Sequence, residues 1–263
     1  MLHRINRAIG RRLATFLTKS LPGYQRLDTV PVANIASVLQ TGDIVLVEGN
    51  TRISVAIKYL SQSSWSHSSL FVGRPGAATS EPLLLEADLR HGVRLVSLDH
   101  YADFNLRICR AEGLTQEERQ QVVDFARERL GHQYDLKNVF DLVRYLIQKP
   151  AVPNRYRRMM LGIGSGEPTR AICSTMIAEA FQSIDYPILP LHGRDVGRGG
   201  ALPEYYYRRH FTHFTPRDFD LSPYFNVIKP TIVHGFDFRT LEWRDELPQK
   251  GAGGATDSAS TTG

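Results

Sequence analysis

Five short apolar runs between residues 44 and 111 constrain the fold more than any other feature of the sequence. They cover residues 44–47, 68–72, 83–87, 93–98 and 105–111, and turn-forming residues bound most of them. Runs of this length between Gly, Pro, Asn and Ser residues are typical of β-strands. Because the last four runs are joined by short connections, which suit hairpins better than crossovers, we predict that they pair antiparallel.

Helical periodicity occupies much of the remaining chain. Thr115 and Glu118 form a capping-box pattern at the start of one helix, and Gly131 follows its last apolar residue. We predict helices over residues 53–60, 115–130, 136–147 and 171–184, a further helix start at Thr215-Pro216, and a strand over residues 225–228. The expected fold class is therefore α+β, with an antiparallel sheet or small barrel packed against helices.

Length and composition predict one main domain between two tails. A chain of 263 residues with 42% hydrophobic content can bury one substantial core. We place a basic N-terminal helix at residues 1–27, the main domain at residues 28–248 and a disordered tail at residues 249–263, where small and polar residues predominate. No apolar run approaches the roughly 20 residues that a membrane-spanning helix requires, so we expect a soluble or peripheral protein.

The N-terminal segment is both basic and amphipathic. Its apolar residues recur at helical spacing and lie on a different stripe of the helix from Arg4, Arg7 and Arg11. These apolar residues are Leu2, Ile5, Ile9, Leu13, Phe16 and Leu17. Two interpretations are open: residues 1–26 contact an anionic membrane surface, or the apolar stripe packs against the main domain. Arginines interrupt the apolar stretch and no small-residue cleavage site follows, which argues against a secretory signal.

Two cysteines, Cys109 and Cys173, are too few for a disulfide framework in a chain of this length. We therefore predict a reducing, cytoplasmic location, which includes a peripheral one on the inner face of the membrane. Cys109 lies in the apolar run 105–111, where two-residue alternation places it opposite Ile108. We expect a structural, half-buried position for Cys109.

Cys173 stands at the start of the predicted helix 171–184. Amide dipoles at a helix N-terminus favour a thiolate, which is the nucleophilic form of cysteine. His67 follows a Ser-rich loop and could act as the base, while Glu86 in the next strand could hold the imidazole in a useful tautomer. Each residue also has an ordinary interpretation. Cys173 could be a small buried residue, His67 a surface histidine and Glu86 an exposed strand-edge carboxylate.

The order of these residues resembles that of a known family. The segments that carry the resemblance are Gly42-Asp43-Ile44-Val45-Leu46, Ser64-Trp65-Ser66-His67, Leu85-Glu86-Ala87 and Ile172-Cys173-Ser174. They resemble the permuted branch of the NlpC/P60 superfamily, in particular the YiiX/YebB-like cysteine hydrolases, which are also called lipo-like proteins. In ordinary papain-like enzymes the nucleophilic Cys precedes the His. Here His67 precedes Cys173, as the permuted order requires.

The resemblance implies a circularly permuted papain-like (NlpC/P60) fold with a Cys-His-Glu triad at Cys173, His67 and Glu86. It implies a hydrolase that cleaves an amide bond, in a peptide or an N-acyl amine, through an acyl-enzyme. The basic N-terminus favours an alternative, a membrane-associated thiol acyltransferase or lipid deacylase of the lecithin:retinol acyltransferase type. A non-catalytic peripheral binding protein is a third possibility. The expected partner is a peptide, acylated amine or lipid substrate, with no nucleic acid and no cofactor.

Three other patterns carry weaker signals. Residues 162–166 are glycine-rich but lack the strand and the Gly-Lys-Ser/Thr ending of a phosphate loop, so we predict a flexible lid within a basic surface loop over residues 149–170. His210 and His213 have metal-ligand spacing without a third ligand nearby, and we expect no metal there. The tyrosine-rich run 205–209 is more typical of a core or groove edge than of a nucleic-acid surface.

Overall fold

The computed structural model describes residues 15–27, 30–76, 81–88, 91–132, 172–194 and 204–241. Several predicted segments lie outside the described residues: most of the N-terminal helix, the helix over residues 136–147, the basic loop over residues 149–170 with its glycine-rich lid, and the tail over residues 249–263. The division of the chain into three parts at residues 27 and 248 stays a prediction.

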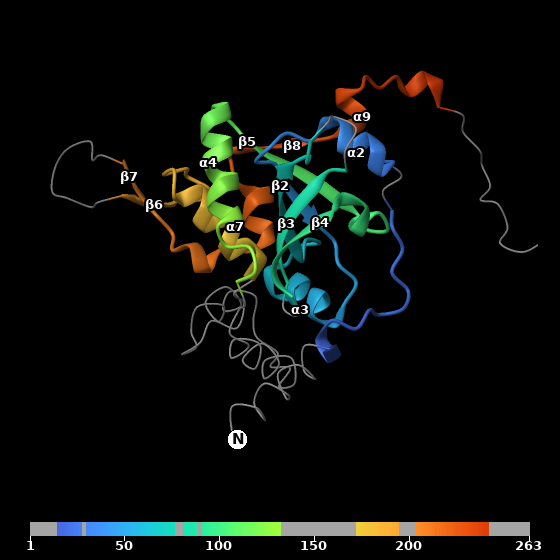
Figure 1. The fold of residues 1–263 in the computed structure, drawn as a ribbon, viewed down its shortest axis with the longest axis horizontal. Helices are drawn as coiled ribbons and strands as arrows, with labels where there is room; N and C mark the ends of the chain where they lie inside the picture. The colour runs from blue at the N-terminus through green and yellow to red at the C-terminus, as the bar shows by residue number, and fades with distance from the viewer. Residues whose placement is uncertain are drawn as a thin grey trace, which may run out of the picture.

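Six strands form one open antiparallel sheet, in the order β4-β3-β2-β1-β5-β8 (Figure 1). Their bounds are β1 Ile44–Val47, β2 His67–Gly73, β3 Leu83–Asp88, β4 Gly92–Ser97, β5 Leu106–Ala111 and β8 Phe225–Ile228. Every neighbouring pair is antiparallel, and the bounds agree closely with the predicted runs. The α+β prediction is therefore confirmed, with an open sheet in place of a barrel.

Helices cover both faces of this sheet. Within the described residues they are α2 Val32–Val38, α3 Arg52–Ser61, α4 Gln116–Arg127, α7 Ile172–Gln182, α8 Pro216–Leu221, α9 Pro230–Val233 and the 3-10 helices η1 Leu98–Tyr101, η2 Phe211–His213 and η3 Phe238–Thr240. α7 packs against β2, β3 and α4, whereas α2 and η1 pack on the opposite face. None of the described helices is long and apolar enough to cross a bilayer.

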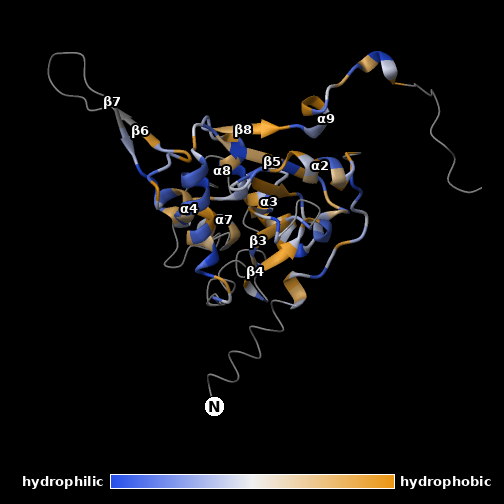
Figure 2. Ribbon diagram, turned by 45° about the horizontal axis from the view of Figure 1, so that its top comes forward, coloured by the Kyte–Doolittle hydropathy of each residue, from blue (hydrophilic) through white to orange (hydrophobic). Residues whose placement is uncertain are grey.

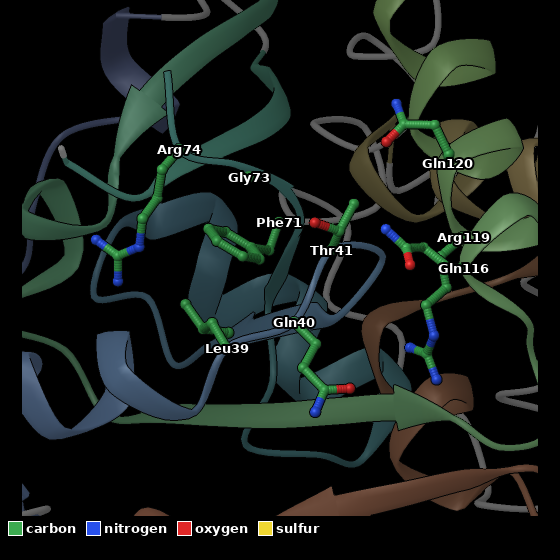
Figure 3. A pocket seen from close by; sticks show the side chains of 9 residues that line it. All are labelled: Leu39, Gln40, Thr41, Phe71, Gly73, Arg74, Gln116, Arg119 and Gln120. Atoms are coloured by element: carbon green, nitrogen blue, oxygen red, sulfur yellow. The ribbon is translucent and has the colours of Figure 1, made fainter. Parts of the chain in front are cut away.

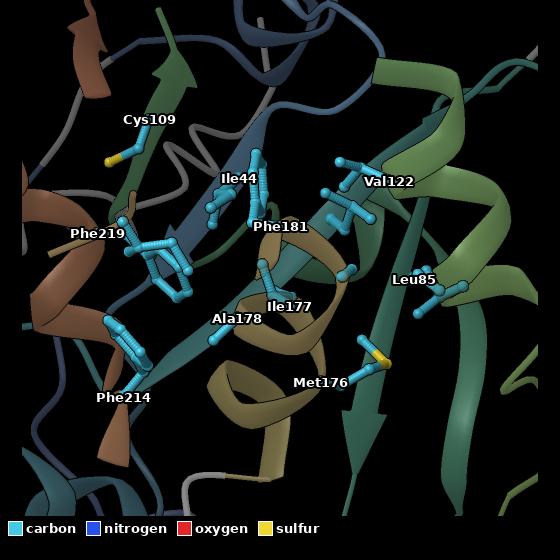
Figure 4. Close-up of a cluster of buried hydrophobic side chains, with 14 of the residues drawn as sticks. Ile44, Leu85, Cys109, Val122, Met176, Ile177, Ala178, Phe181, Phe214 and Phe219 are labelled. Carbon is cyan, nitrogen blue, oxygen red and sulfur yellow. The ribbon is translucent and has the colours of Figure 1, made fainter. Parts of the chain in front are cut away.

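The sheet separates two apolar cores, which explains why β1 is buried along its whole length. Ile44 and Leu46 belong to the larger core around α7, while Val45 and Val47 belong to the smaller core around α2 (Figure 4). This is the two-residue period of a strand that is covered on both faces. Figure 2 shows hydrophobic colour on strands of this sheet, among them β4, β5 and β8.

Cys109 is fully buried in the larger core, so the prediction of a half-buried residue is wrong. The alternation itself is confirmed, because Ile108 lies in the smaller core on the other face. The difference arises because α8 brings Phe219 over the face of β5 that carries Cys109 (Figure 4).

Helix α4 begins as predicted and ends earlier than predicted. The Thr115 side chain accepts from the Glu118 N–H and the Glu118 carboxylate accepts from the Thr115 N–H, which is the expected capping box. Beyond Arg127 the chain tightens into turns, and the N–H of Gly131 donates to the carbonyl of Val93 in β4. This tightening leaves Leu130, the last apolar residue of the predicted helix, exposed.

Gly42 and Asp43 have a structural role. Gly42 adopts a positive φ of 87°, which glycine tolerates best, and turns the chain into β1. The Asp43 carboxylate is fully buried and accepts two hydrogen bonds from the Arg110 guanidinium, at 2.8 and 2.7 Å, and one from the N–H of Gln40. A buried charge that is paired in this way fixes β5 against the turn that precedes β1.

The described part of the N-terminal segment packs against the main domain. Leu17 is buried, the N–H of Leu21 donates to the carbonyl of Asn50, and Arg26 donates to the carbonyl of Ala102. Phe16 remains 55% exposed, with the Arg52 guanidinium 3.9 Å above its ring. The end of the apolar stripe at Leu17 therefore packs on the domain, and contact of the preceding residues with a membrane stays a prediction.

The tyrosine-rich run lies in a hairpin apart from the main sheet. β7 Glu204–Tyr207 pairs only with β6 Leu191–Arg194 among the described strands. Tyr206 and Tyr207 are exposed, which excludes a core position for both residues, and the alternative of a groove edge stays a prediction. Among the described residues, no second layer covers this hairpin and buries these two side chains.

Candidate active site

His67, Glu86 and Cys173 come from three elements that meet at one end of the sheet. His67 is the first residue of β2, Glu86 lies in β3 next to it, and Cys173 is the second residue of α7, which packs on both strands. The residue after His67, Ser68, is fully buried and its hydroxyl lies 3.2 Å from that of Ser174 in α7. This contact places the first turn of α7 directly against the start of β2.

A tight turn delivers His67 to this position. Helix α3 ends at Gln62, whose positive φ of 52° reverses the chain, and β2 begins five residues later at His67. The hydroxyl of Ser66 accepts from the N–H of Gly49 at 2.9 Å and so ties the turn to the end of β1. A Cβ on Gly49 would lie only 2.4 Å from the Ser54 hydroxyl, so this close approach requires glycine.

Glu86 is a buried carboxylate with three hydrogen-bond donors. His67 Nε2 donates to Oε2 at 2.7 Å, Arg94 Nε donates to Oε1 at 2.8 Å, and the Tyr101 hydroxyl donates to Oε2. Burial alone would raise the pKa of Glu86, but the hydrogen bonds from His67 and Tyr101 and the charges of His67 and Arg94 lower it to about 2. Glu86 is therefore ionised, and the interpretation as an exposed edge residue is excluded.

The ionised Glu86 fixes the tautomer of His67. A carboxylate only accepts hydrogen bonds, so the proton of the shared bond must lie on Nε2 of the imidazole. Nδ1 is then the nitrogen that can exchange a proton with Cys173. Burial disfavours the charged imidazole, but the Cys173 thiolate and the Glu86 carboxylate raise the pKa of His67 to about 10.

Cys173 is buried, with 4% of its surface exposed. Burial raises the pKa of its thiol, but the His67 imidazolium and the N–H and hydroxyl of Ser68 outweigh burial and lower the pKa to about 7. The thiol of Cys109, in contrast, has its pKa raised to about 12 by burial and by the nearby Asp220 carboxylate. The two cysteines therefore differ greatly in their expected reactivity.

Sequence reasoning missed Arg94, Tyr101, Ser68 and Ser174. Arg94 had a local signal, because a hairpin that pairs Asp88 with Gly92 also pairs Glu86 with Arg94. Tyr101 lies in a 3-10 helix after β4 and has no periodic pattern that would link it to Glu86. The contact between Ser68 and Ser174 joins residues far apart in the sequence, so only the tertiary structure reveals it.

Two other features of the described residues lie apart from these side chains. A cavity of about 500 Å³ opens beside Gly73, at the end of β2 opposite His67, and Arg119, Gln116 and Gln40 are among its lining residues (Figure 3). The His210 ring bonds the hydroxyl of Thr212 at 2.8 Å. No group of three or more His, Cys, Asp or Glu side chains suited to a metal ion occurs in the described part of the chain.

Residues 38–145 match the model of a family described as permuted papain-like amidase enzymes, YaeF/YiiX, C92 family. The matched region includes β1, β2 and β3 and thus both His67 and Glu86. This region of the chain is thus similar to the permuted papain-like family. The match supports an enzyme of the papain-like amidase class, and a cysteine hydrolase in general terms. Cys173 lies beyond the matched residues, and placement in the wider NlpC/P60 superfamily stays a prediction.

A solved structure titled as the metalloprotein yiiX from Escherichia coli O157:H7 is also similar to the chain. The sequences are 19% identical, the TM-score is 0.45, and the alignment covers 72% of this chain and 96% of that one. At this level of similarity we infer nothing about activity or metal binding from that protein. A search of curated proteins found no match.

Proposed function

We propose that this protein is a thiol amidase of the permuted papain-like type, with Cys173 as nucleophile, His67 as general base and acid, and Glu86 as the residue that orients the imidazole. The observation that carries the proposal is the Cys173-His67 pair, in which the pKa of the thiol falls to about 7 while that of the imidazole rises to about 10. Opposite shifts of this kind favour a thiolate beside an imidazolium near neutral pH.

The expected reaction has two stages. The Cys173 thiolate attacks the carbonyl carbon of the amide, and the tetrahedral intermediate collapses as the His67 imidazolium gives its proton to the departing amine. Water then attacks the thioester while His67 accepts a proton from the water. This step releases the carboxylic acid and restores the Cys173 thiolate beside the His67 imidazolium. The N–H of Cys173, in the first turn of α7, lacks an intrahelical acceptor and is our candidate for an oxyanion donor.

Labelling with an iodoacetamide probe, followed by peptide mapping, tests the roles of the site residues. We expect Cys173 to react at pH 7 at least tenfold faster than Cys109, since the two thiols differ in pKa by several units. His67→Ala is expected to slow the labelling of Cys173, whereas Cys109→Ala leaves it unchanged. Equal labelling of wild type and His67→Ala would overturn the triad and favour a non-catalytic protein.

The bond that is cleaved can be identified with matched substrates. An N-acyl amine, a short peptide and a phospholipid that carry the same acyl group differ only in the leaving group. We expect the first two to be cleaved, with loss of activity in Cys173→Ala. Cleavage of the phospholipid alone would refute the amidase proposal and support a lipid deacylase.

A lipid-directed activity is the second candidate, and one observation favours it. The C-terminal segment that contains α9 and η3 exposes several large apolar side chains beside Lys229 and Arg239, namely Ile232, Val233, Phe236 and Phe238. Apolar and basic side chains on one exposed segment suit an anionic lipid surface. These side chains support contact with lipid in addition to the amphipathic pattern of the N-terminal residues.

Co-sedimentation with vesicles that contain phosphatidylserine tests this second candidate. The deletion should remove residues 1–14 only, because Leu17 and Arg26 pack on the domain. The full chain, the deletion variant and the double variant Phe236→Ser/Phe238→Ser are compared, with neutral vesicles as a control. Loss of binding in either variant supports contact with lipid, and the absence of binding by the full chain excludes it.

A further inference from the structure

The carboxylate of Glu86 is held in part by a residue outside the sheet. The Tyr101 hydroxyl, in the 3-10 helix η1, donates to Oε2 of Glu86, the same oxygen that accepts from His67 Nε2. Tyr101 is buried, and its ring centroid lies 5.9 Å from that of His67. The last side-chain torsion of a glutamate has broad energy wells, so the carboxylate turns easily unless donors fix it. The direction of Oε2 therefore depends on where η1 holds the Tyr101 hydroxyl.

Helix η1 is short, and different parts of the chain hold its two ends. At the start, the Ser97 hydroxyl accepts from the N–H of Asp99 at 3.0 Å. At the end, the Arg26 guanidinium donates to the carbonyl of Ala102, the C-cap residue of η1. Arginine side chains stabilise helix C-termini in this way, by their hydrogen bonds and by their positive charge.

The N-terminal strap, residues 19–27, also holds the loop that follows η1. The Tyr24 hydroxyl accepts from the N–H of Asn105 at 2.9 Å. The Tyr24 ring lies 5.7 Å from that of Phe104, which lies 6.3 Å from that of Tyr101. Aromatic rings at these separations attract one another. The strap and η1 therefore pack together as one unit behind the site.

We infer that Tyr101 is a positioning residue for Glu86, and that the N-terminal strap keeps it in place through Arg26. Each step is a direct hydrogen bond: from the strap to the end of η1, from Tyr101 to Glu86, and from His67 to the same carboxylate oxygen. The sequence places Arg26 among basic residues that could contact a membrane, whereas the structure gives its guanidinium acceptors within the protein. The inference rests on the proposed roles of His67 and Glu86.

The expected effect is a change in the titration of His67, at the end of this series. Tyr101→Phe keeps the ring and removes only the donor, so a less well oriented Glu86 should lower the pH at which His67 loses its proton by about one unit. Arg26→Ala should cause a smaller shift in the same direction, and Arg26→Lys, which still donates, should restore part of it. Because the two residues act in series, Arg26→Ala/Tyr101→Phe should shift no further than Tyr101→Phe alone.

The variants leave the other charged and titratable neighbours unchanged. In the described part of the chain these are Arg94 from β4, Cys173 from α7 and His100 from η1 itself. Arg94 Nε donates to the second carboxylate oxygen at 2.8 Å, and the His100 ring lies 5.0 Å from that of Tyr101. A shift at His67 therefore reports on the tyrosine and the strap.

The experiment is nitrogen NMR of histidine-labelled protein from pH 6 to 11, which follows the protons on both ring nitrogens of His67. His67→Ala assigns the signals. Lys19→Ala is the matched control, because it removes a positive charge from the same strap, and the Lys19 side chain forms no hydrogen bond or ion pair with the described residues. It should leave the titration of His67 unchanged. Urea unfolding checks that each variant is folded.

The direction of the shift decides the outcome. A lower titration midpoint in both Tyr101→Phe and Arg26→Ala supports the inference. An unchanged midpoint in Tyr101→Phe overturns it, and so does a higher one, which would mean that Tyr101 only competes with His67 for the carboxylate. An effect of Tyr101→Phe without one of Arg26→Ala overturns the role of the strap. If instead Cys173 of the wild type reacts with iodoacetamide no faster than Cys109, the proposed function itself fails.

Discussion

At the scale of single residues, the charge balance of the site depends on Glu86. Its carboxylate is almost fully buried and is ionised because His67, Arg94 and Tyr101 all donate to it. An ionised Glu86 in turn keeps the proton on Nε2 of His67 and leaves Nδ1 for exchange with Cys173. The ordinary chemistry of the thiol is thus changed by residues that do not touch it.

The rate of hydrolysis should follow a bell-shaped pH profile. It is expected to rise with an apparent pKa of about 7 as Cys173 ionises and to fall with one of about 10 as the imidazolium loses its proton. Both values belong to the interacting pair. In His67→Ala the alkylation midpoint should rise from about 7 towards 9.0, the ordinary pKa of the thiol, since the largest cause that lowers the pKa is removed while burial remains. An unchanged midpoint in this variant would show that His67 does not activate Cys173.

Acid stability should also report on Glu86. Its pKa is lowered from 4.5 to about 2, so its ionised form contributes stability that is fully present above pH 4.5 and is lost as the pH falls towards 2. The shift corresponds to about 3 kcal/mol. We expect the free energy of unfolding in urea to fall more between pH 5 and pH 2 in the wild type than in Glu86→Gln. Parallel pH dependences in the two proteins would contradict this assignment.

At the scale of elements, the turn between β1 and α3 determines where β2 begins. Gly49 allows the N–H at the end of β1 to reach Ser66, the residue before His67. A side chain at Gly49 would meet the hydroxyls of Ser54 at 2.4 Å and Ser66 at 2.8 Å. The position of the imidazole therefore depends on a backbone approach that only glycine permits.

Gly49→Ala is expected to destabilise the protein by about 1 to 3 kcal/mol, which is typical of overpacking, and to slow the labelling of Cys173. The added methyl group displaces Ser66 and with it the start of β2. Ser54→Ala removes the closer of the two hydroxyls and should partly restore both properties in the double variant. Thermal unfolding and labelling rates measure the outcome, and wild-type behaviour of Gly49→Ala would refute this role of the turn.

At the scale of the whole molecule, the site exists only while α7 is docked on the sheet. Helix α7 carries Cys173 at one end and Phe181 near the other, and Phe181 is fully buried against Tyr186 and Phe225. The apolar contacts that hold the helix in place are thus remote from the thiol. Activation of Cys173 should therefore depend on the stability of the larger core.

Phe181→Ala is expected to lower the free energy of unfolding by about 3 to 5 kcal/mol, because it leaves a cavity in the larger core. Loss of docking should reduce the selectivity of labelling, with slower reaction at Cys173 and faster reaction at Cys109. Tyr206→Ala, which truncates an exposed side chain, is the control and should change neither property. Retention of full selectivity in Phe181→Ala would show that the site does not need this contact.

The strands could be predicted because alternation and turn residues are local signals. Periodicity likewise predicted the start of α4 at its capping box and the position of Cys173 in the first turn of α7. The predicted end of α4 was wrong, because the hydrogen bond from the N–H of Gly131 to the carbonyl of Val93 joins separate elements and has no local signal in the sequence. The half-buried position predicted for Cys109 was also wrong, and Tyr206 does not lie in a core, since burial depends on whether a second layer covers a strand.

The sequence by itself determined the order of the proposed site residues along the chain, with His67 and Glu86 ahead of Cys173. Only the tertiary structure decided how these residues act. It placed Arg94 and Tyr101 on Glu86, the hydroxyl of Ser174 beside the sulfur of Cys173, and the hydroxyl of Ser68 against that of Ser174. The physical reason is that a pKa depends on burial and on charges within a few ångströms, and distances between β2, β3 and α7 are set by packing in three dimensions.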